Sequence, residues 1–420
     1  MENKIDDKLT IRDYLKSFGP GAIMAAAIIG PGTVTTASSQ GANFGYASIW
    51  IILSACIIAY FFQEPAIRIS IGCKQDVMLG IRDHIGRNWA IFLYVVIFVG
   101  SIAFQAGNLT GCAMALTYFI PGTSTALWTV SLSLLALVLI WFNKYSIIEN
   151  ANQILIIMMV LAFVITALYS GPSLGTIATK GFSFKIPGGD ATLALGLLAT
   201  TVTPNLTLGY SSFLRKKYPN PNNSSRLIKT SKFDLGLNMF ITFLITGSIV
   251  ICAAAVLNPK GIAIKSAGDM AVQLTPILGR FAGIFFSLGL WAAAFSSVLY
   301  QVSLHNMLLP RVFNISDDPK AKHNIIVTLL VIIVPILIII FSGSSPISLI
   351  VTAQALNGIA LPMVFILTWI LSNKKDFMGE YINKLHNNII MGIITCFTLA
   401  FSLNAIVGVV KKIITLTGGK

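Results

Sequence analysis

Two short stretches place proline among small and polar residues inside segments that are otherwise apolar. They are Gly30-Pro31-Gly32-Thr33 and Thr203-Pro204-Asn205. Proline lacks the N–H group that a helix interior needs and clashes with the preceding turn, so each stretch is expected to break its helix. A helix that restarts after a break offers unpaired N–H groups and the positive end of its dipole. The chemistry expected at these breaks is the binding of a small polar or charged group by backbone and neutral side chains.

The composition indicates that the helices containing these breaks span a membrane. Of the 420 residues, 55% are hydrophobic and 10% are charged, whereas a soluble chain carries about a quarter charged residues. Apolar runs of about 20 residues recur, each long enough to cross about 30 Å of hydrocarbon. We therefore expect an all-α polytopic membrane protein, with residues 1–420 forming a single transmembrane domain. The first 17 residues are charged and amphipathic, so no cleavable signal peptide is expected there.

About eleven spans are predicted, at residues 16–43, 46–70, 89–119, 124–142, 147–170, 190–214, 233–256, 277–308, 322–342, 346–372 and 387–410.

The distribution of lysine and arginine predicts the orientation in the membrane. With the N-terminus in the cytoplasm, about 21 of the 29 basic residues fall on the cytoplasmic side, as the positive-inside rule requires. The odd number of spans then places the C-terminus outside the cell membrane. This topology also accounts for the net charge of +14, so the expected partners are the lipid bilayer and a small ion or molecule, and no nucleic acid. The sequence does not indicate an oligomeric state.

The two breaks occupy corresponding positions in the chain. The first lies in the first of five spans, and the second lies in the first of the next five. Interrupted segments at matching positions of two halves indicate a secondary transporter built from inverted repeats, because unwound backbone is tolerated at membrane depth only where it faces protein or a watery cavity. The repeats would cover about residues 16–170 and 190–372, with an extra helix at about 387–410. A pair of proline kinks without a ligand remains the alternative.

The residues around both breaks resemble the natural resistance-associated macrophage protein (NRAMP) family of divalent-metal transporters. The stretch I-G-P-G-T-V-T-T-A-S-S-Q-G-A-N-F-G-Y is similar to the family's first helix, where Asp-Pro-Gly-Asn precedes a Gly-Ala-x-Phe-Gly-Tyr segment. The stretch G-L-L-A-T-T-V-T-P-N is similar to the family's Gly-Ala-Thr-Val-Met-Pro-His-Asn region. Ala353-Gln354 and Phe295-Ser296-Ser297 also fit. The resemblance implies a LeuT-like 5+5 inverted repeat with an eleventh helix.

The same resemblance implies that the charged and soft ligands of the family are missing. Gly30 and Thr33 stand at the positions of the metal-binding Asp and its following Asn, and Thr203 stands at the position of the Met ligand. Gln354 is the ligand position that is clearly retained. The family's histidines and the acidic pair of its proton route correspond to Asn205, Tyr210, Gln105 and Asn108.

These departures change the chemistry expected of the site. A dehydrated divalent cation needs carboxylate ligands, and thioether sulfur favours transition metals over Mg²⁺ and Ca²⁺. Two helix N-termini without a neighbouring carboxylate instead suit an anion. Our leading expectation is therefore the transport of a small anion such as bicarbonate, or of a small carboxylate or amino acid. The expected binding residues are Gly30, Pro31, Gly32, Thr33, Thr200, Thr203, Asn205, Gln354 and Asn357.

The alternative is a transporter for a divalent cation, Mg²⁺-like or Mn²⁺-like, that is held through neutral oxygen ligands. A largely hydrated Mg²⁺ needs few direct ligands. A neutral solute, or a sensor that does not transport, is also open. A sensor would be expected to carry a sizeable soluble domain, so terminal tails of about 17 and 10 residues argue against it. No catalytic motif such as H-E-x-x-H is present, so we expect neither an enzyme nor a cofactor.

The ion that drives transport is left undecided between Na⁺ and H⁺. Gln105, Asn108 and Tyr210 would line a polar path where the family has its proton route. Ser296 and Ser297 could join a Na⁺ site, or could serve as small residues for helix packing.

The remaining ionisable residues are expected to serve the structure rather than transport. Glu64 is expected to pair with Arg68 one helical turn later, and Asp269 is expected to cap a helix. The histidines are interpreted as lying at loops or helix ends, which argues against a histidine-rich metal site: they are His84, His305, His323 and His386.

Overall fold

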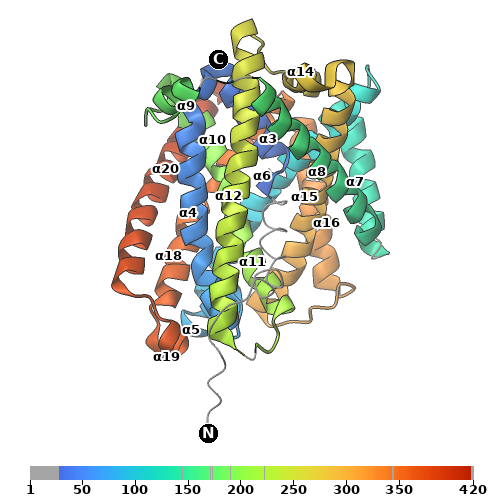
Figure 1. Cartoon of the computed structure of the whole chain (residues 1–420). Helices are drawn as coiled ribbons and strands as arrows, with labels where there is room; N and C mark the ends of the chain where they lie inside the picture. The colour runs from blue at the N-terminus through green and yellow to red at the C-terminus, as the bar shows by residue number, and fades with distance from the viewer. Residues whose placement is uncertain are drawn as a thin grey trace.

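The computed structural model describes residues 28–142, 145–170, 172, 174–189, 191–221, 223–342 and 345–417. Throughout these residues the regular structure is helical (Figure 1). The described part of each of the eleven predicted spans is helical over most of its length. The beginning of the first predicted span, residues 16–27, lies outside the described residues, and so does the N-terminus that was expected in the cytoplasm.

All but the last of the helices of the first half fall within the first predicted repeat, about residues 16–170. They are α3 (Pro31–Phe44), α4 (Ile49–Ile67), α5 (Val77–His84), α6 (Arg87–Phe119), α7 (Thr125–Trp141), α8 (Tyr145–Tyr169) and the short α9 (Leu174–Gly181).

The second half begins with a divided helix and ends with the extra helix. It contains α10 (Ala191–Thr201), α11 (Pro204–Lys217), α12 (Ser224–Val256), α13 (Ala267–Ala271), α14 (Thr275–Leu278), α15 (Ala282–Phe313), α16 (Lys322–Phe341), α17 (Pro346–Gly358), α18 (Leu361–Ser372), α19 (Lys375–Met378) and α20 (Leu385–Thr417). By length and hydropathy alone, six helical runs of the described residues could each cross a membrane, or seven if α8 and α9, bent by 106°, form one span.

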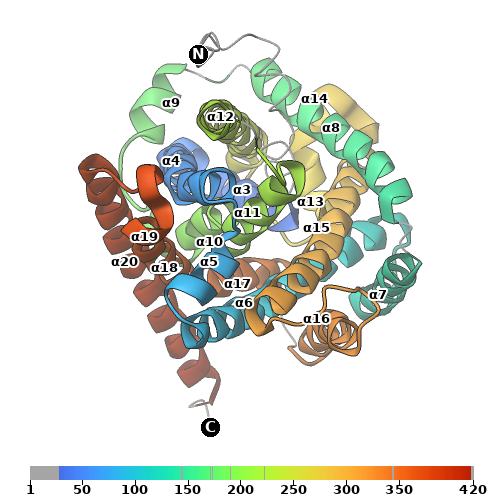
Figure 2. The same ribbon diagram turned by 90° about the horizontal axis from the view of Figure 1, so that it is seen from below.

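The short broken helices lie inside the bundle and the long apolar ones lie outside. Seen along the bundle, α3, α10 and α11 are surrounded by α4, α6, α12, α15 and α17, while α7 and α20 lie at opposite edges (Figure 2). Residues 31–42 of α3 are all buried although many are polar. In contrast, Leu134 and Val138 of α7 are more than half exposed. This polar-inside, apolar-outside arrangement is what a bilayer requires, because lipid tails solvate the apolar rim.

One face of α6 carries three glycines that allow other helices to approach closely. A Cβ atom at Gly100 would lie 3.1 Å from Asn357 Oδ1, and one at Gly107 would lie 3.3 Å from Ala353 Cβ. A Cβ atom at Gly111 would lie 2.3 Å from Cβ of Pro31. The glycine face therefore fixes both α17 and the start of α3 at the centre of the bundle.

Gly111→Ala is expected to destabilise the protein and to displace the start of α3. The added methyl group would overlap the rigid Pro31 ring, and overpacking of this kind costs about 1–3 kcal/mol. The measurement is the thermal unfolding midpoint in detergent together with uptake into proteoliposomes. Gly247→Ala in α12 is the matched control, because nothing lies within 4 Å of its Cβ position. Equal midpoints for the two variants would contradict the packing role of Gly111.

Ion pairs gather at the end of the bundle where α5 and α19 lie (Figure 1). The predicted pair is confirmed, because Arg68 Nε donates to both carboxylate oxygens of Glu64 at 3.0 Å. Lys232 of α12 pairs with the same carboxylate, and Arg68 also donates to Asn383 Oδ1 at 2.6 Å. These contacts join α4, α12 and the segment that leads into α20.

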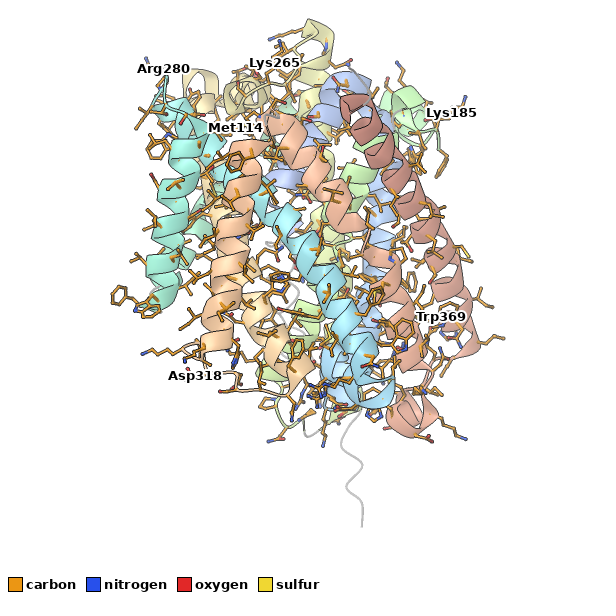
Figure 3. The ribbon with its side chains drawn as sticks, turned by 180° about the vertical axis from the view of Figure 1, so that it is seen from behind. Met114, Lys185, Lys265, Arg280, Asp318 and Trp369 are labelled. Carbon is orange, nitrogen blue, oxygen red and sulfur yellow. The ribbon has the colours of Figure 1, made fainter. Side chains whose placement is uncertain are left out.

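The opposite end of the bundle carries Lys185, Lys265 and Arg280 (Figure 3). Asp269 lies at this end too, and its predicted capping role is confirmed. Its Oδ2 accepts from the backbone N–H of Ser266 at 2.9 Å, and Ser266 in turn caps α13. The predicted topology places this end outside the cell, and that orientation stays a prediction.

Candidate substrate site at the two helix breaks

The first break lies immediately before α3. Gly30 is the N-cap of α3, with extended backbone angles (φ −100°, ψ −176°), and Pro31 follows as the first helical residue. The first backbone hydrogen bond of the helix runs from Val34 N to Gly30 O at 3.1 Å. The N–H groups of Gly32 and Thr33 therefore have no partner within the helix. The Thr33 hydroxyl turns back and donates to Ile28 O at 2.5 Å.

The second break separates α10 from α11 and repeats this design. Thr203 is the N-cap of α11 with extended angles (φ −98°, ψ 136°), its side chain makes no capping bond, and Pro204 follows. The N–H of Asn205 has no acceptor within the helix at this position. The Thr200 hydroxyl is used locally, because it donates to Leu197 O at 2.8 Å.

Asn205 connects the second break to the long helices α6 and α15. Its Nδ2 donates to Ser101 Oγ at 3.0 Å and to Gln301 Oε1 at 3.3 Å. Its backbone carbonyl accepts from Tyr300 Oη at 3.3 Å. These contacts orient the carboxamide, and its Oδ1 has no partner within the ranges that the structure describes.

Helix α17 brings two more carboxamides to the same place. Gln354 lies against the first break, because a Cβ atom on Gly32 would lie 2.0 Å from Gln354 Nε2. Asn357 lies nearly one turn further along α17, and its Oδ1 approaches Gly100, the neighbour of the Ser101 that binds Asn205. Gln354, Asn357 and Asn205 therefore converge between the starts of α3 and α11.

The converging carboxamides are buried but have free polar atoms. Gln354, Asn357 and Asn205 are 1%, 0% and 2% exposed. Among the described residues, no partner reaches either polar atom of Gln354, either polar atom of Asn357, or Oδ1 of Asn205. Leaving a buried polar group unpaired costs about 1–3 kcal/mol. Five such atoms at one place indicate a site that water or a ligand fills.

Of the three residues of the predicted polar path, Gln105 and Asn108 are in contact, and Tyr210 is not bonded to either of them. Gln105 Nε2 donates to Val298 O at 3.2 Å, and Asn108 Nδ2 donates to Gln105 Oε1 at 3.4 Å. Tyr210 is buried on α11 and its hydroxyl has no partner among the described residues. The hydroxyls of Ser296 and Ser297 both donate to Ala293 O at 3.0 Å. The Na⁺ site and the polar path stay predictions.

Sequence reasoning missed the residues that hold the carboxamides in place. Ser101, Gln301 and Gly100 are single small or polar residues within long apolar helices, and no local pattern distinguishes them. One interpretation was wrong: His305 does not lie at a loop or helix end, but inside α15, where it is fully buried.

The site is electrically neutral as far as its described side chains are concerned. Among the described residues, no group of three or more His, Cys, Asp or Glu side chains could hold a metal ion. The polar atoms that converge are amide oxygens and nitrogens, with two helix N-termini behind them. Such a site can accept either a cation through its oxygens or an anion through its N–H groups.

An all-helical membrane bundle with paired helix breaks around a buried polar site defines a secondary transporter. The chain belongs to the Nramp family, because the family model described as natural resistance-associated macrophage protein-like matches residues 21–408. Members of this family are transporters, so the prediction that the chain is not an enzyme is confirmed.

Two curated relatives are similar along nearly their whole length. Both are named divalent metal cation transporter MntH. The protein from Caldanaerobacter subterraneus is 26% identical over 382 residues, covering 89% of this chain and 88% of the relative. The protein from Clostridium acetobutylicum is 27% identical over 403 residues, covering 94% and 91%.

Solved structures confirm the predicted fold. The manganese transporter of Eremococcus coleocola, in complex with an aromatic bis-isothiourea compound, superposes with a TM-score of 0.80 at 18% identity, over 94% of this chain and 86% of that one. MhsT in complex with L-phenylalanine gives a TM-score of 0.61 at 14% identity, over 94% and 98%. The all-α, LeuT-like architecture expected from the sequence is therefore correct.

Proposed function

We propose that this chain transports a divalent cation, Mg²⁺-like or Mn²⁺-like, that keeps part of its water shell. The observation that carries the proposal is the set of three buried amide oxygens, of Gln354, Asn357 and Asn205, that have no partner in the described part of the chain. The named relatives, which are divalent metal cation transporters, favour this reading. It replaces our leading expectation of a small anion such as bicarbonate, because the named relatives favour a divalent cation.

Neutral oxygens can serve a divalent cation only if water supplies the rest of its coordination. Mg²⁺ dehydrates reluctantly and usually keeps several waters, so three amide oxygens and a few retained waters make a reasonable set. None of the three oxygens is a soft ligand, and soft sulfur is what favours transition metals. We therefore expect weak discrimination between Mg²⁺ and Mn²⁺.

A small anion remains the second candidate because of the helix N-termini. The N–H groups of Gly32, Thr33 and Asn205 are unpaired within α3 and α11, and neither N-cap supplies a side-chain acceptor. Gln354 Nε2 and Asn357 Nδ2 are also without partners among the described residues. Donors of this kind bind anions at helix N-termini.

Uptake into proteoliposomes distinguishes these candidates. Mn²⁺ and Mg²⁺ are expected to accumulate with saturation, and Gln354→Ala is expected to lower the initial rate at least about tenfold because one oxygen ligand is lost. The same vesicles are tested with bicarbonate and with small amino acids. Asn306→Ala is the matched control, since this carboxamide bonds to Thr328 outside the site. Uptake of bicarbonate or an amino acid without uptake of either cation would overturn the proposal.

A further inference from the structure

A second group of unpaired polar atoms lies between α6 and α15, which run side by side (Figure 2). His305 of α15 is 0% exposed, and neither of its ring nitrogens has a partner among the described residues. The rings of Tyr94 and Phe98 on α6 meet it edge to face, at centroid distances of 5.8 Å and 5.2 Å. Tyr94 Oη is also buried without a partner among those residues.

Gln301 links this group to the candidate substrate site. It lies one turn before His305 on the same face of α15, about 6 Å along the helix axis. Its Oε1 accepts from Asn205 at 3.3 Å, while its Nε2 has no partner among the described residues. Unpaired polar atoms thus continue from Asn205 through Gln301 to His305 and Tyr94. We name these last three residues the histidine column.

The side chains of the histidine column are those of a site for ordered water rather than those of an apolar core. An imidazole carries one N–H donor and one lone pair when neutral, and each needs a partner when it is buried. Buried water is found where several polar groups would otherwise be unpaired. A phenyl ring would fill an apolar gap between α6 and α15 without leaving such atoms unpaired.

We propose that the histidine column holds water and that His305 carries protons through it to and from the substrate site. In this step the lone pair of the neutral ring takes a proton from a hydronium ion, which becomes water, and the resulting imidazolium releases the proton of its other ring nitrogen to a water on the other side. Histidine suits this role because it changes charge near neutral pH. Ionisable groups inside membrane spans are costly and commonly mark proton pathways.

The titratable and charged side chains near His305 are Tyr94, Tyr300 and the ion pair of Arg311 with Asp76. Tyr94 is the titratable side chain in direct ring contact with it, and Tyr300 on the same helix donates its hydroxyl to Asn205 O. Further along α15, Arg311 is paired with Asp76 of the segment before α5. The coupling of protons to cargo rests on the transport function proposed above, whereas the protonation of His305 does not.

Protonation can be measured directly by nitrogen NMR. The protein carries three other histidines, so His84, His323 and His386 are replaced by Gln to leave one ring signal. We expect the ring nitrogens of His305 to shift reversibly as the pH is lowered and to exchange with solvent. A ring that stays neutral and unchanged at every pH at which the protein remains folded would overturn the proposal.

Proton flux provides the second test. Vesicles with an internal pH dye and an imposed membrane potential are compared for the wild type, His305→Gln and His305→Phe. Both variants are expected to lower proton flux at least about tenfold, while downhill cargo uptake by His305→Gln is retained. His323→Gln is the control, since this ring bonds to Ser316 O at 2.7 Å away from the column.

The two proposals fail in distinguishable ways. Cation uptake with a proton flux that both His305 variants leave unchanged would overturn the histidine column and spare the cargo assignment. Titration of His305 and loss of proton flux in the variants, without any cation uptake by the wild type, would overturn the cargo assignment and spare the histidine column.

Discussion

Gly32→Ala is expected to remove most transport while the protein still folds. An alanine Cβ at this position would lie 2.0 Å from Nε2, 2.4 Å from Cδ and 2.9 Å from Cγ of Gln354. Three atoms of the side chain are too close, so Gln354 has to leave its rotamer and withdraw its carboxamide from the site. We expect the initial uptake rate to fall at least about tenfold, equivalent to about 1.4 kcal/mol of lost binding.

The matched control for this variant is Gly196→Ala on α10. A Cβ atom at Gly196 would make ordinary contacts of 3.4 Å with Thr36 and 3.5 Å with Val351, so it adds a methyl group near α3 without touching Gln354. Uptake and thermal unfolding are measured for both variants. If Gly32→Ala transports at the wild-type rate, Gln354 does not bind the cargo in the way proposed.

Gly30→Asp is the second large change, and it tests the charge of the site. Gly30 is an N-cap with φ near −100°, a conformation that aspartate adopts readily and a position where it stabilises helices. The carboxylate would add negative charge beside the amide oxygens of the site. Because the charge of the ligands sets the affinity for hard divalent cations, we expect Mn²⁺ and Mg²⁺ to bind at least about tenfold more tightly. Isothermal titration of the purified variant measures this.

Gly30→Asn separates charge from helix capping. Asparagine caps a helix as well as aspartate does but brings no net charge, so it is expected to leave the cation affinity nearly unchanged. Equal cation affinities for the two variants would show that the break at Gly30 is not part of the cation site. Adding Thr203→Met to Gly30→Asp is expected to favour Mn²⁺ over Mg²⁺, because thioether sulfur is a soft ligand.

The parts of the fold that follow from local chemistry could be predicted from the sequence. Pro31 and Pro204 must interrupt a helix wherever they lie, and both helices restart at these residues. Glu64 and Arg68 are one turn apart, so their pairing needs only a helix. The apolar runs had to be helices because a lipid bilayer leaves few other ways to satisfy the backbone.

The neighbours of the site depended on tertiary packing and could not be predicted in this way. Ser101 and Gln301 bind Asn205 from helices that are 104 and 96 residues away in sequence. The glycine that admits Asn357 is recognised only when α6 and α17 are seen in contact. His305 was misplaced because α15 extends five residues beyond its predicted end at residue 308, to Phe313.

The proposed cargo is a cation that is held at neutral carboxamides. The most direct measurement is the sign of the transport current on a solid-supported membrane after a substrate jump, at equal pH on both sides. Mn²⁺ or Mg²⁺ is expected to give a saturable current of positive charge moving with the cargo, and Gln354→Ala is expected to reduce it at least about tenfold. No current with either cation, together with a current of opposite sign on adding bicarbonate that Gln354→Ala abolishes, would contradict the claim.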